Sequence, residues 1–92
     1  MTSRSVSVVN QLGMHARAAA KFVQLAGRFR SRVTVSRQGR EMDGKSVMGL
    51  LLLAAAHGTA VTIAADGEDE QAAVDALAEL VASGFGEDAC NA

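Results

Sequence analysis

The sequence predicts an α+β fold in which helices cover one face of a small β-sheet. Three observations support this prediction. Segments with the alternating pattern of strands and segments with helical spacing follow one another in the order β-α-β-β-α-β-α. The chain has 92 residues, which suits one domain with a single core, and we expect residues 1–92 to form it. No internal repeat, low-complexity segment or linker divides the chain.

The first part of the chain predicts a strand, a loop and a helix. Residues 4–9 alternate loosely, with Val6 and Val8 on one face of the predicted strand. Residues 10–14 form a loop, in which Gly13 permits a sharp turn. Residues 16–27 have helical spacing, and Gly27 is a plausible stop. The apolar stripe of this helix contains Ala16, Ala19, Ala20 and Val23, extended by Phe22, Ala26 and Phe29.

The middle of the chain predicts a hairpin and a short helix. Residues 32–37 alternate most cleanly, a Gln-Gly turn follows, and residues 40–43 return as an antiparallel partner. Ser46 is placed to cap a helix over residues 47–53. This helix is apolar on nearly every side, although a short helix on a sheet buries only one side. We therefore expect some of its side chains to be exposed as a partner surface.

The last part of the chain predicts a strand and a helix. Residues 60–64 form the strand, with Val61 and Ile63 toward the core. The acidic residues 68–70 then begin the helix, where its dipole favours negative charge. The buried stripe of this helix consists of Ala73, Val74, Leu77, Leu80 and Val81. Gly84 ends the helix, and residues 86–92 are expected to form a flexible tail.

Composition and charge argue against several classes of protein. A hydrophobic content of 49% with 21% charged residues is typical of a soluble domain, and a net charge of −1 carries no nucleic-acid signature. The longest apolar run, residues 47–56, is shorter than the roughly 20 residues that span a bilayer. No signal-peptide core begins the chain and Cys90 has no cysteine to pair with, so we expect a cytoplasmic protein. Neither a zinc-type Cys/His cluster nor a nucleotide-binding P-loop is present, and no metal or cofactor is expected.

His15 lies where the loop enters the first predicted helix, two residues before Arg17. The first N–H groups of a helix lack intrahelical partners and carry partial positive charge, so they favour a bound anion. An imidazole there, with a guanidinium able to hold phosphate oxygens, points to phosphoryl chemistry. The same residues also fit a surface histidine near an unrelated arginine. His57 has no such companion and is interpreted as a polar loop residue.

The two motifs of the chain resemble those of a known family. The run NQLGMHAR at residues 10–17 resembles the active-site motif of the HPr family, the histidine-containing phosphocarriers of the bacterial phosphoenolpyruvate-dependent phosphotransferase system. The run GKSVMG at residues 44–49 resembles the second signature of that family, around its regulatory serine. The resemblance covers essentially the whole chain. It implies an open-faced β-sandwich, a four-stranded antiparallel sheet covered by three helices.

The resemblance also implies a function. His15 would take a phosphoryl group on Nδ1 from phosphorylated Enzyme I and pass it to a IIA protein or domain, while Arg17 pairs with the phosphate. Such a protein is a carrier rather than a turnover enzyme, and we expect a monomer without nucleic-acid binding or membrane insertion. The implied partner surface contains Ala20, Lys45, Val47, Met48 and Leu51. Arg17, Lys21 and Lys45 would form a basic rim beside it.

Ser46 supports an alternative function of another class. Its spacing alone favours a helix cap, but a phosphate at a helix start is electrostatically tolerated. The resemblance matches Ser46 to the position that HPr kinase/phosphorylase modifies, so the chain would be a regulatory binding module controlled by Ser46 phosphorylation. Two departures from the family bear on the choice. Ala18 stands where the family often has proline, and this alanine resembles the variant in HPr-like proteins of nitrogen-type regulatory systems. Gln24 stands where many members have a basic residue, so a role in regulation is open beside one in sugar transport.

Overall fold

Four strands and three helices follow the predicted order in the computed structural model, which describes residues 1–53 and 55–86. The elements are β1 (Thr2–Ser7), α1 (Ala16–Ala26), β2 (Arg32–Arg37), β3 (Arg40–Asp43), α2 (Val47–Leu53), β4 (Ala60–Asp66) and α3 (Glu70–Ala82). The expected tail over residues 86–92, which includes Cys90, lies outside the described residues apart from Gly86. Within the described part, no helix is long and apolar enough to cross a bilayer.

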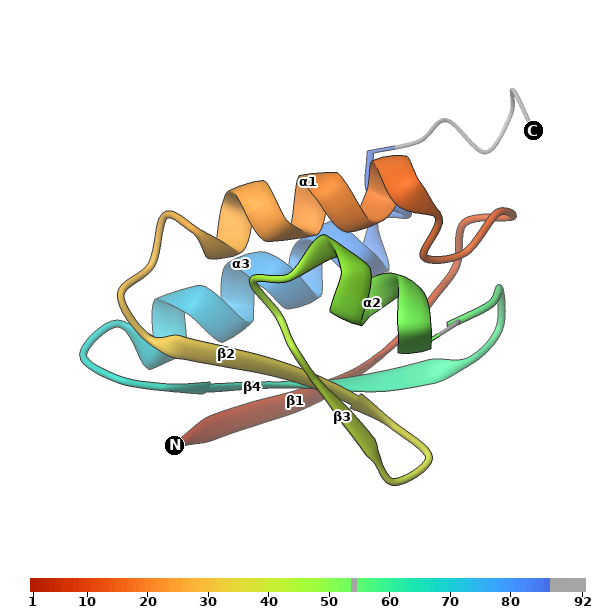
Figure 1. The fold of residues 1–92 in the computed structure, drawn as a ribbon. Helices are drawn as coiled ribbons and strands as arrows, with labels where there is room; N and C mark the ends of the chain where they lie inside the picture. The colour runs from red at the N-terminus through yellow and green to blue at the C-terminus, as the bar shows by residue number, and fades with distance from the viewer. Residues whose placement is uncertain (54, 87–92) are drawn as a thin grey trace.

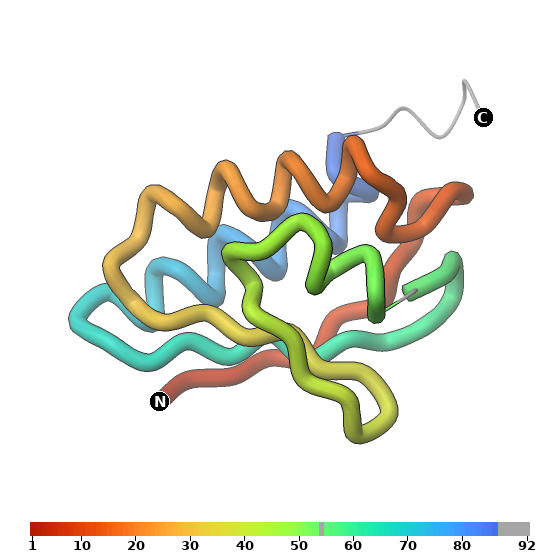
Figure 2. The backbone as a smooth tube through the Cα atoms, in the orientation of Figure 1, coloured from red at the N-terminus to blue at the C-terminus, as the bar shows by residue number. Residues whose placement is uncertain are grey.

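The sheet is antiparallel throughout, with the strand order β1-β4-β2-β3. The three helices lie on one face of it and leave the other face open (Figure 1). This arrangement confirms the predicted open-faced sandwich. The loop that precedes α1 and the segment that follows α2 lie at the same end of the molecule (Figure 2), and this end carries His15.

The core lies between the sheet and the helices. Val35 of β2 and Ile63 of β4 are fully buried, as their alternation predicts. The buried stripe of α1 consists of Ala18, Ala19, Phe22 and Ala26. Ala16 was expected in this stripe and is exposed instead, because its position around the helix falls outside the face that the buried residues share.

Strands β1 and β4 differ from their predicted bounds because their partners decide where they end. Val8 was expected in β1, but its N–H donates to the carbonyl of Thr59 at 2.8 Å and its carbonyl accepts from Gly58 at 2.8 Å. It therefore pairs with the loop before β4 and lies beyond the end of β1. Strand β4 extends to Asp66 because it is paired on both sides, with Ala65 opposite Thr2 of β1.

The acidic cluster at the start of α3 does more than complement the helix dipole. Asp69 makes no side-chain capping bond to α3. Its carboxylate accepts hydrogen bonds from the Ser31 hydroxyl and from the N–H groups of Arg30 and Ser31, the latter two at 2.9 Å. The Ser31 hydroxyl, followed by the Arg30 N–H, lowers the pKa of Asp69 to about 2. Asp69 thus ties the α1–β2 loop to α3, a role that the sequence interpretation missed.

Candidate functional site

His15 is the N-cap of α1. Its backbone is extended, with φ −79° and ψ 178°, and its carbonyl accepts the first intrahelical bond, from Ala19 at 2.8 Å. The side chain turns back to the helix, so that Nδ1 accepts from the N–H of Arg17 at 3.3 Å. The lone pair of Nδ1 therefore points toward the positive end of α1, where the predicted phosphate would sit.

The loop before His15 is held from two sides. Gly13 has φ +65°, the left-handed conformation that glycine adopts at little cost, and a Cβ there would lie 2.6 Å from the carbonyl oxygen of Ala55. That same oxygen accepts from the N–H of Met14 at 2.9 Å. On the other side, Asn10 Nδ2 donates to the Gly13 carbonyl at 2.7 Å. The backbone of Ala55 thus fixes the approach of the chain to His15.

The basic residues of the predicted rim lie in different places. Arg17 is exposed in the first turn of α1, directly after the histidine. Lys21 lies four residues further along and donates from Nζ to the carbonyl of Phe85 at 2.8 Å, which ties α1 to the turn that follows α3. Lys45 donates from Nζ to the carbonyl of Phe29 at 2.8 Å, beyond the C-terminus of α1. Since α1 is about 16 Å long and His15 caps its other end, Lys45 is not part of a cluster around the histidine.

Ser46 caps α2 as predicted. Its Oγ accepts from the N–H of Gly49 at 3.1 Å, and its carbonyl accepts from Leu50 at 3.1 Å. The hydroxyl therefore satisfies one of the N–H groups that a helix leaves without an intrahelical partner. The side chain is half-buried.

Helix α2 presents an exposed apolar surface, as its composition predicted. Leu50 and Leu53 face the core, whereas Met48 is 66% exposed and Leu52 is 53% exposed. The α2 apolar surface consists of these two exposed residues and the half-buried Val47 and Leu51. Ala20 of α1 is half-buried. Leu12, 73% exposed in the loop before His15, was not singled out from the sequence because an isolated leucine in a loop carries no periodic signal.

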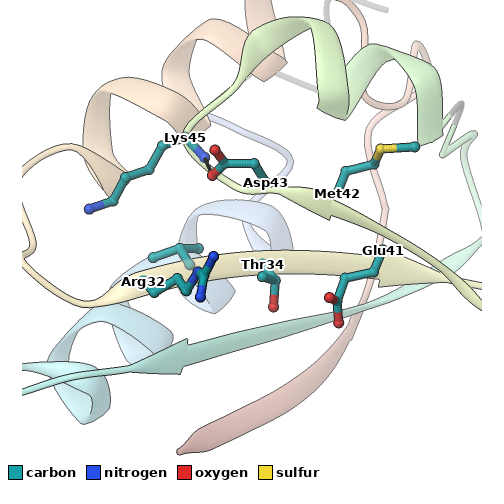
Figure 3. Close-up of a pocket in the computed structure, with 7 residues that line it drawn as sticks. Arg32, Thr34, Glu41, Met42, Asp43 and Lys45 are labelled. Atoms are coloured by element: carbon teal, nitrogen blue, oxygen red, sulfur yellow. Dashed lines mark hydrogen bonds between the residues drawn. The ribbon is translucent and has the colours of Figure 1, made fainter.

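A hollow of about 370 Å³ beside β2 and β3 is not a second candidate site. Arg32, Thr34, Glu41, Met42, Asp43 and Lys45 line it (Figure 3). Its two cations are matched by two carboxylates, so it offers no net charge to an anion. In residues 1–53 and 55–86, no group of three or more His, Cys, Asp or Glu side chains is arranged to hold a metal ion. His57 is exposed in the loop before β4.

Comparisons with known proteins identify the family of the chain. A family model described as the PTS HPr component phosphorylation site matches residues 2–83. The chain is 54% identical over 87 residues to the phosphocarrier protein HPr of Cupriavidus necator, covering 95% of this chain and 98% of that protein. It is 47% identical over 81 residues to the HPr-like protein Crh of Bacillus subtilis, covering 88% of this chain and 95% of that protein.

Solved structures of HPr from Thermoanaerobacter tengcongensis have the same fold. One, of HPr-C-His, superposes with a TM-score of 0.91 at 39% identity and covers 96% of this chain and 99% of that chain. Another, described as an HPr dimer, superposes with a TM-score of 0.75 at 39% identity and covers 95% of this chain and 100% of that chain. With a family model matched over nearly its whole length, the chain belongs to the HPr family of phosphotransferase-system phosphocarriers.

Proposed function

We propose that His15 is the phosphoryl acceptor of this phosphocarrier and that Nδ1 is the atom that takes the group. The observation that carries the proposal is the hydrogen bond from the Arg17 N–H to Nδ1, at 3.3 Å. An atom that accepts a hydrogen bond holds a lone pair, which is what attack on phosphorus requires. The bond that places this lone pair also places the future phosphate at the start of α1.

The transfer itself is a simple displacement. The Nδ1 lone pair forms a bond to phosphorus while the bond between phosphorus and the donor breaks, and the donor atom keeps that electron pair. The N–H groups of the first turn of α1 and the guanidinium of Arg17 then stabilise the added negative charge. The reverse displacement, onto an acceptor, regenerates His15. The protein is thus a carrier that ends each cycle unchanged and does not turn over a substrate of its own.

The partners we propose are phosphorylated Enzyme I as donor and a IIA protein or domain as acceptor, in the cytoplasm. Both would dock on the α2 apolar surface, with Ala20 and Arg17 next to His15. Met48 and Leu52 are largely exposed there, which is typical of a surface that a transient partner covers. Lys45 would contact a partner only at the far end of α2, away from the reacting histidine.

Labelling with phosphoenolpyruvate and Enzyme I tests the acceptor. We expect label that is lost in acid, survives alkali and is absent in His15→Ala. The matched control is His57→Ala, which removes the other histidine from an exposed loop and should label normally. Normal labelling of His15→Ala would overturn the proposal.

Substitution of Met48 tests the docking surface. Met48→Asp places a charge on the α2 apolar surface and should weaken Enzyme I binding while the domain remains folded. Ser3→Asp, exposed in β1 on the open side of the sheet, introduces the same charge away from the helices and should not affect binding. Equal affinities for the two variants, by calorimetry, would exclude this surface.

A regulatory binding module controlled by Ser46 phosphorylation is the second candidate. Two observations favour it: Ser46 Oγ lies at the start of α2, next to the α2 apolar surface, and the chain resembles Crh as well as HPr. Incubation with ATP and HPr kinase/phosphorylase should label the protein but not Ser46→Ala. Label on Ser46 with none on His15 would favour the regulatory module over the carrier.

A monomer is the oligomeric state we propose, because docking through the α2 apolar surface requires that surface to be open. The similarity to a structure described as an HPr dimer makes the mass in solution the relevant measurement. Sedimentation equilibrium should give the mass of one chain at micromolar concentration. A stable dimer would contradict the proposal.

A further inference from the structure

We propose that Arg37, at the end of β2, is a positioning residue for His15. The inference rests on the proposed role of His15 as phosphoryl acceptor. Arg37 lies 22 positions further along the chain and was not singled out from the sequence. The route from one residue to the other runs through the end of α2.

The first step is the contact between Arg37 and α2. Strand alternation places Arg37 on the same face as Val33 and Val35, the face that the helices cover. Its Nε donates to the carbonyl of Leu53 at 3.0 Å, and Leu53 is the last residue of α2. The last carbonyls of a helix lack intrahelical partners and carry partial negative charge, so a guanidinium there both satisfies and stabilises the helix end.

The second step leads from α2 to the loop before His15. Two residues after Leu53, the carbonyl of Ala55 accepts from the N–H of Met14 at 2.9 Å. Gly13 packs so closely on the same carbonyl that no side chain would fit there. The end of α2 and the loop before α1 lie together at one end of the molecule (Figure 2). Arg37 therefore holds the end of α2, two residues before the carbonyl that positions Met14, and Met14 directly precedes His15.

Arg40 provides a matched control. It lies directly opposite Arg37 in the β2–β3 pairing and carries the same charge. It is exposed, and within the described residues its side chain makes no hydrogen bond or ion pair. Any effect of general charge or of the hairpin should therefore appear equally in variants of the two arginines.

Two substitutions separate the hydrogen bond from the charge. Arg37→Met keeps the length of the side chain as far as Nε and removes the donor. Arg37→Gln places an amide nitrogen at the same number of bonds from the backbone as Nε, so it keeps the donor and removes the charge. Arg40→Met is the control for the loss of charge.

Two measurements report on positioning. We expect the Met14 amide to exchange with solvent about 10-fold faster in Arg37→Met, because no side-chain donor then holds the carbonyl of Leu53 at the end of α2. The maximal rate of phosphoryl transfer from Enzyme I to His15 should fall several-fold, with little change in KM, since the docking surface is intact. Arg37→Gln should restore both values, and Arg40→Met should match the unsubstituted protein.

Two outcomes would overturn the inference. One is that Arg37→Met equals Arg40→Met in both Met14 exchange and maximal rate. The other is that Arg37→Gln is as impaired as Arg37→Met, which would make charge and not the placed donor responsible. Failure of the proposed function would look different, because the unsubstituted protein would then not be labelled on His15 at all. Exchange of the Met14 amide would still test whether the hydrogen bond from Arg37 to Leu53 holds the loop before His15.

Discussion

Replacement of Gly13 by alanine tests how the loop positions His15. Gly13 combines a φ of +65° with a close approach to the carbonyl of Ala55, where an added Cβ would lie at 2.6 Å. The Ala55 carbonyl cannot keep its place without a clash, and it is also the acceptor for the Met14 N–H. Gly13→Ala should therefore both destabilise the fold and displace the residue that precedes His15.

The expected magnitude combines three contributions. An alanine in the left-handed region costs about 1–2 kcal/mol. Weakening the Met14–Ala55 hydrogen bond adds about 0.5–1.5 kcal/mol. The backbone strain that remains after the chain moves to avoid the clash brings the total loss of unfolding free energy to about 2–4 kcal/mol. Gly39 is the matched control, because it has φ +82° and nothing within 4 Å of an added Cβ. Gly39→Ala should lose only the conformational part, about 1–2 kcal/mol.

Urea unfolding measures the stability of both variants, and the rate of phosphoryl transfer from Enzyme I measures the site. We expect Gly13→Ala to be the less stable variant, with a Tm lower by about 4–8 °C for each kcal/mol lost. At a temperature where both variants are folded, only Gly13→Ala should accept the phosphoryl group from Enzyme I more slowly than the unsubstituted protein. Equal stability and equal transfer in the two variants would refute the argument that the Ala55 contact positions His15.

Three further predictions concern stability. Hydrogen bonds from Ser31 and Arg30 lower the pKa of Asp69 to about 2, so the ionised carboxylate stabilises the fold above its unfolded pKa, and this contribution is lost as the pH falls from about 4 to 2. In urea unfolding, the free energy of unfolding of Asp69→Asn should therefore fall less over this pH range than that of the unsubstituted protein, and parallel pH profiles would contradict this. Ser46→Ala removes the cap bond to Gly49 and should cost about 1 kcal/mol, so an unchanged urea midpoint would mean that the cap is unimportant. Phe22→Ala empties a fully buried site and should cost about 3–5 kcal/mol, and a loss below 1 kcal/mol would show that the core collapses around it.

The parts of the fold that local signals decide were predicted well. The bounds of β2, β3 and α2 agree with the expected ones, because alternation, a Gln-Gly turn and a capping serine each act over a few residues. The bounds of β1 were not predictable in the same way. Which residues of an edge strand pair depends on β4, and β4 is more than fifty residues away in the chain.

In the candidate functional site, too, local signals predicted some features and distant contacts decided the others. The loop, the helix start and the place of His15 follow from a short motif around Gly13. The contacts that hold this motif do not, since the Met14 N–H donates to the carbonyl of Ala55, far along the chain, and Arg37 reaches a carbonyl 16 residues away. Neither contact has a periodic or compositional signature, so only the folded chain reveals it.

Nuclear magnetic resonance of the phosphorylated protein tests the central claim most directly. With ¹⁵N-labelled histidine, coupling between phosphorus and nitrogen identifies the atom that carries the group. We expect coupling to Nδ1 of His15, the atom that accepts from the Arg17 N–H, and none to His57. Phosphate on Nε2, on His57 or on no histidine after incubation with active Enzyme I would contradict the proposed mechanism.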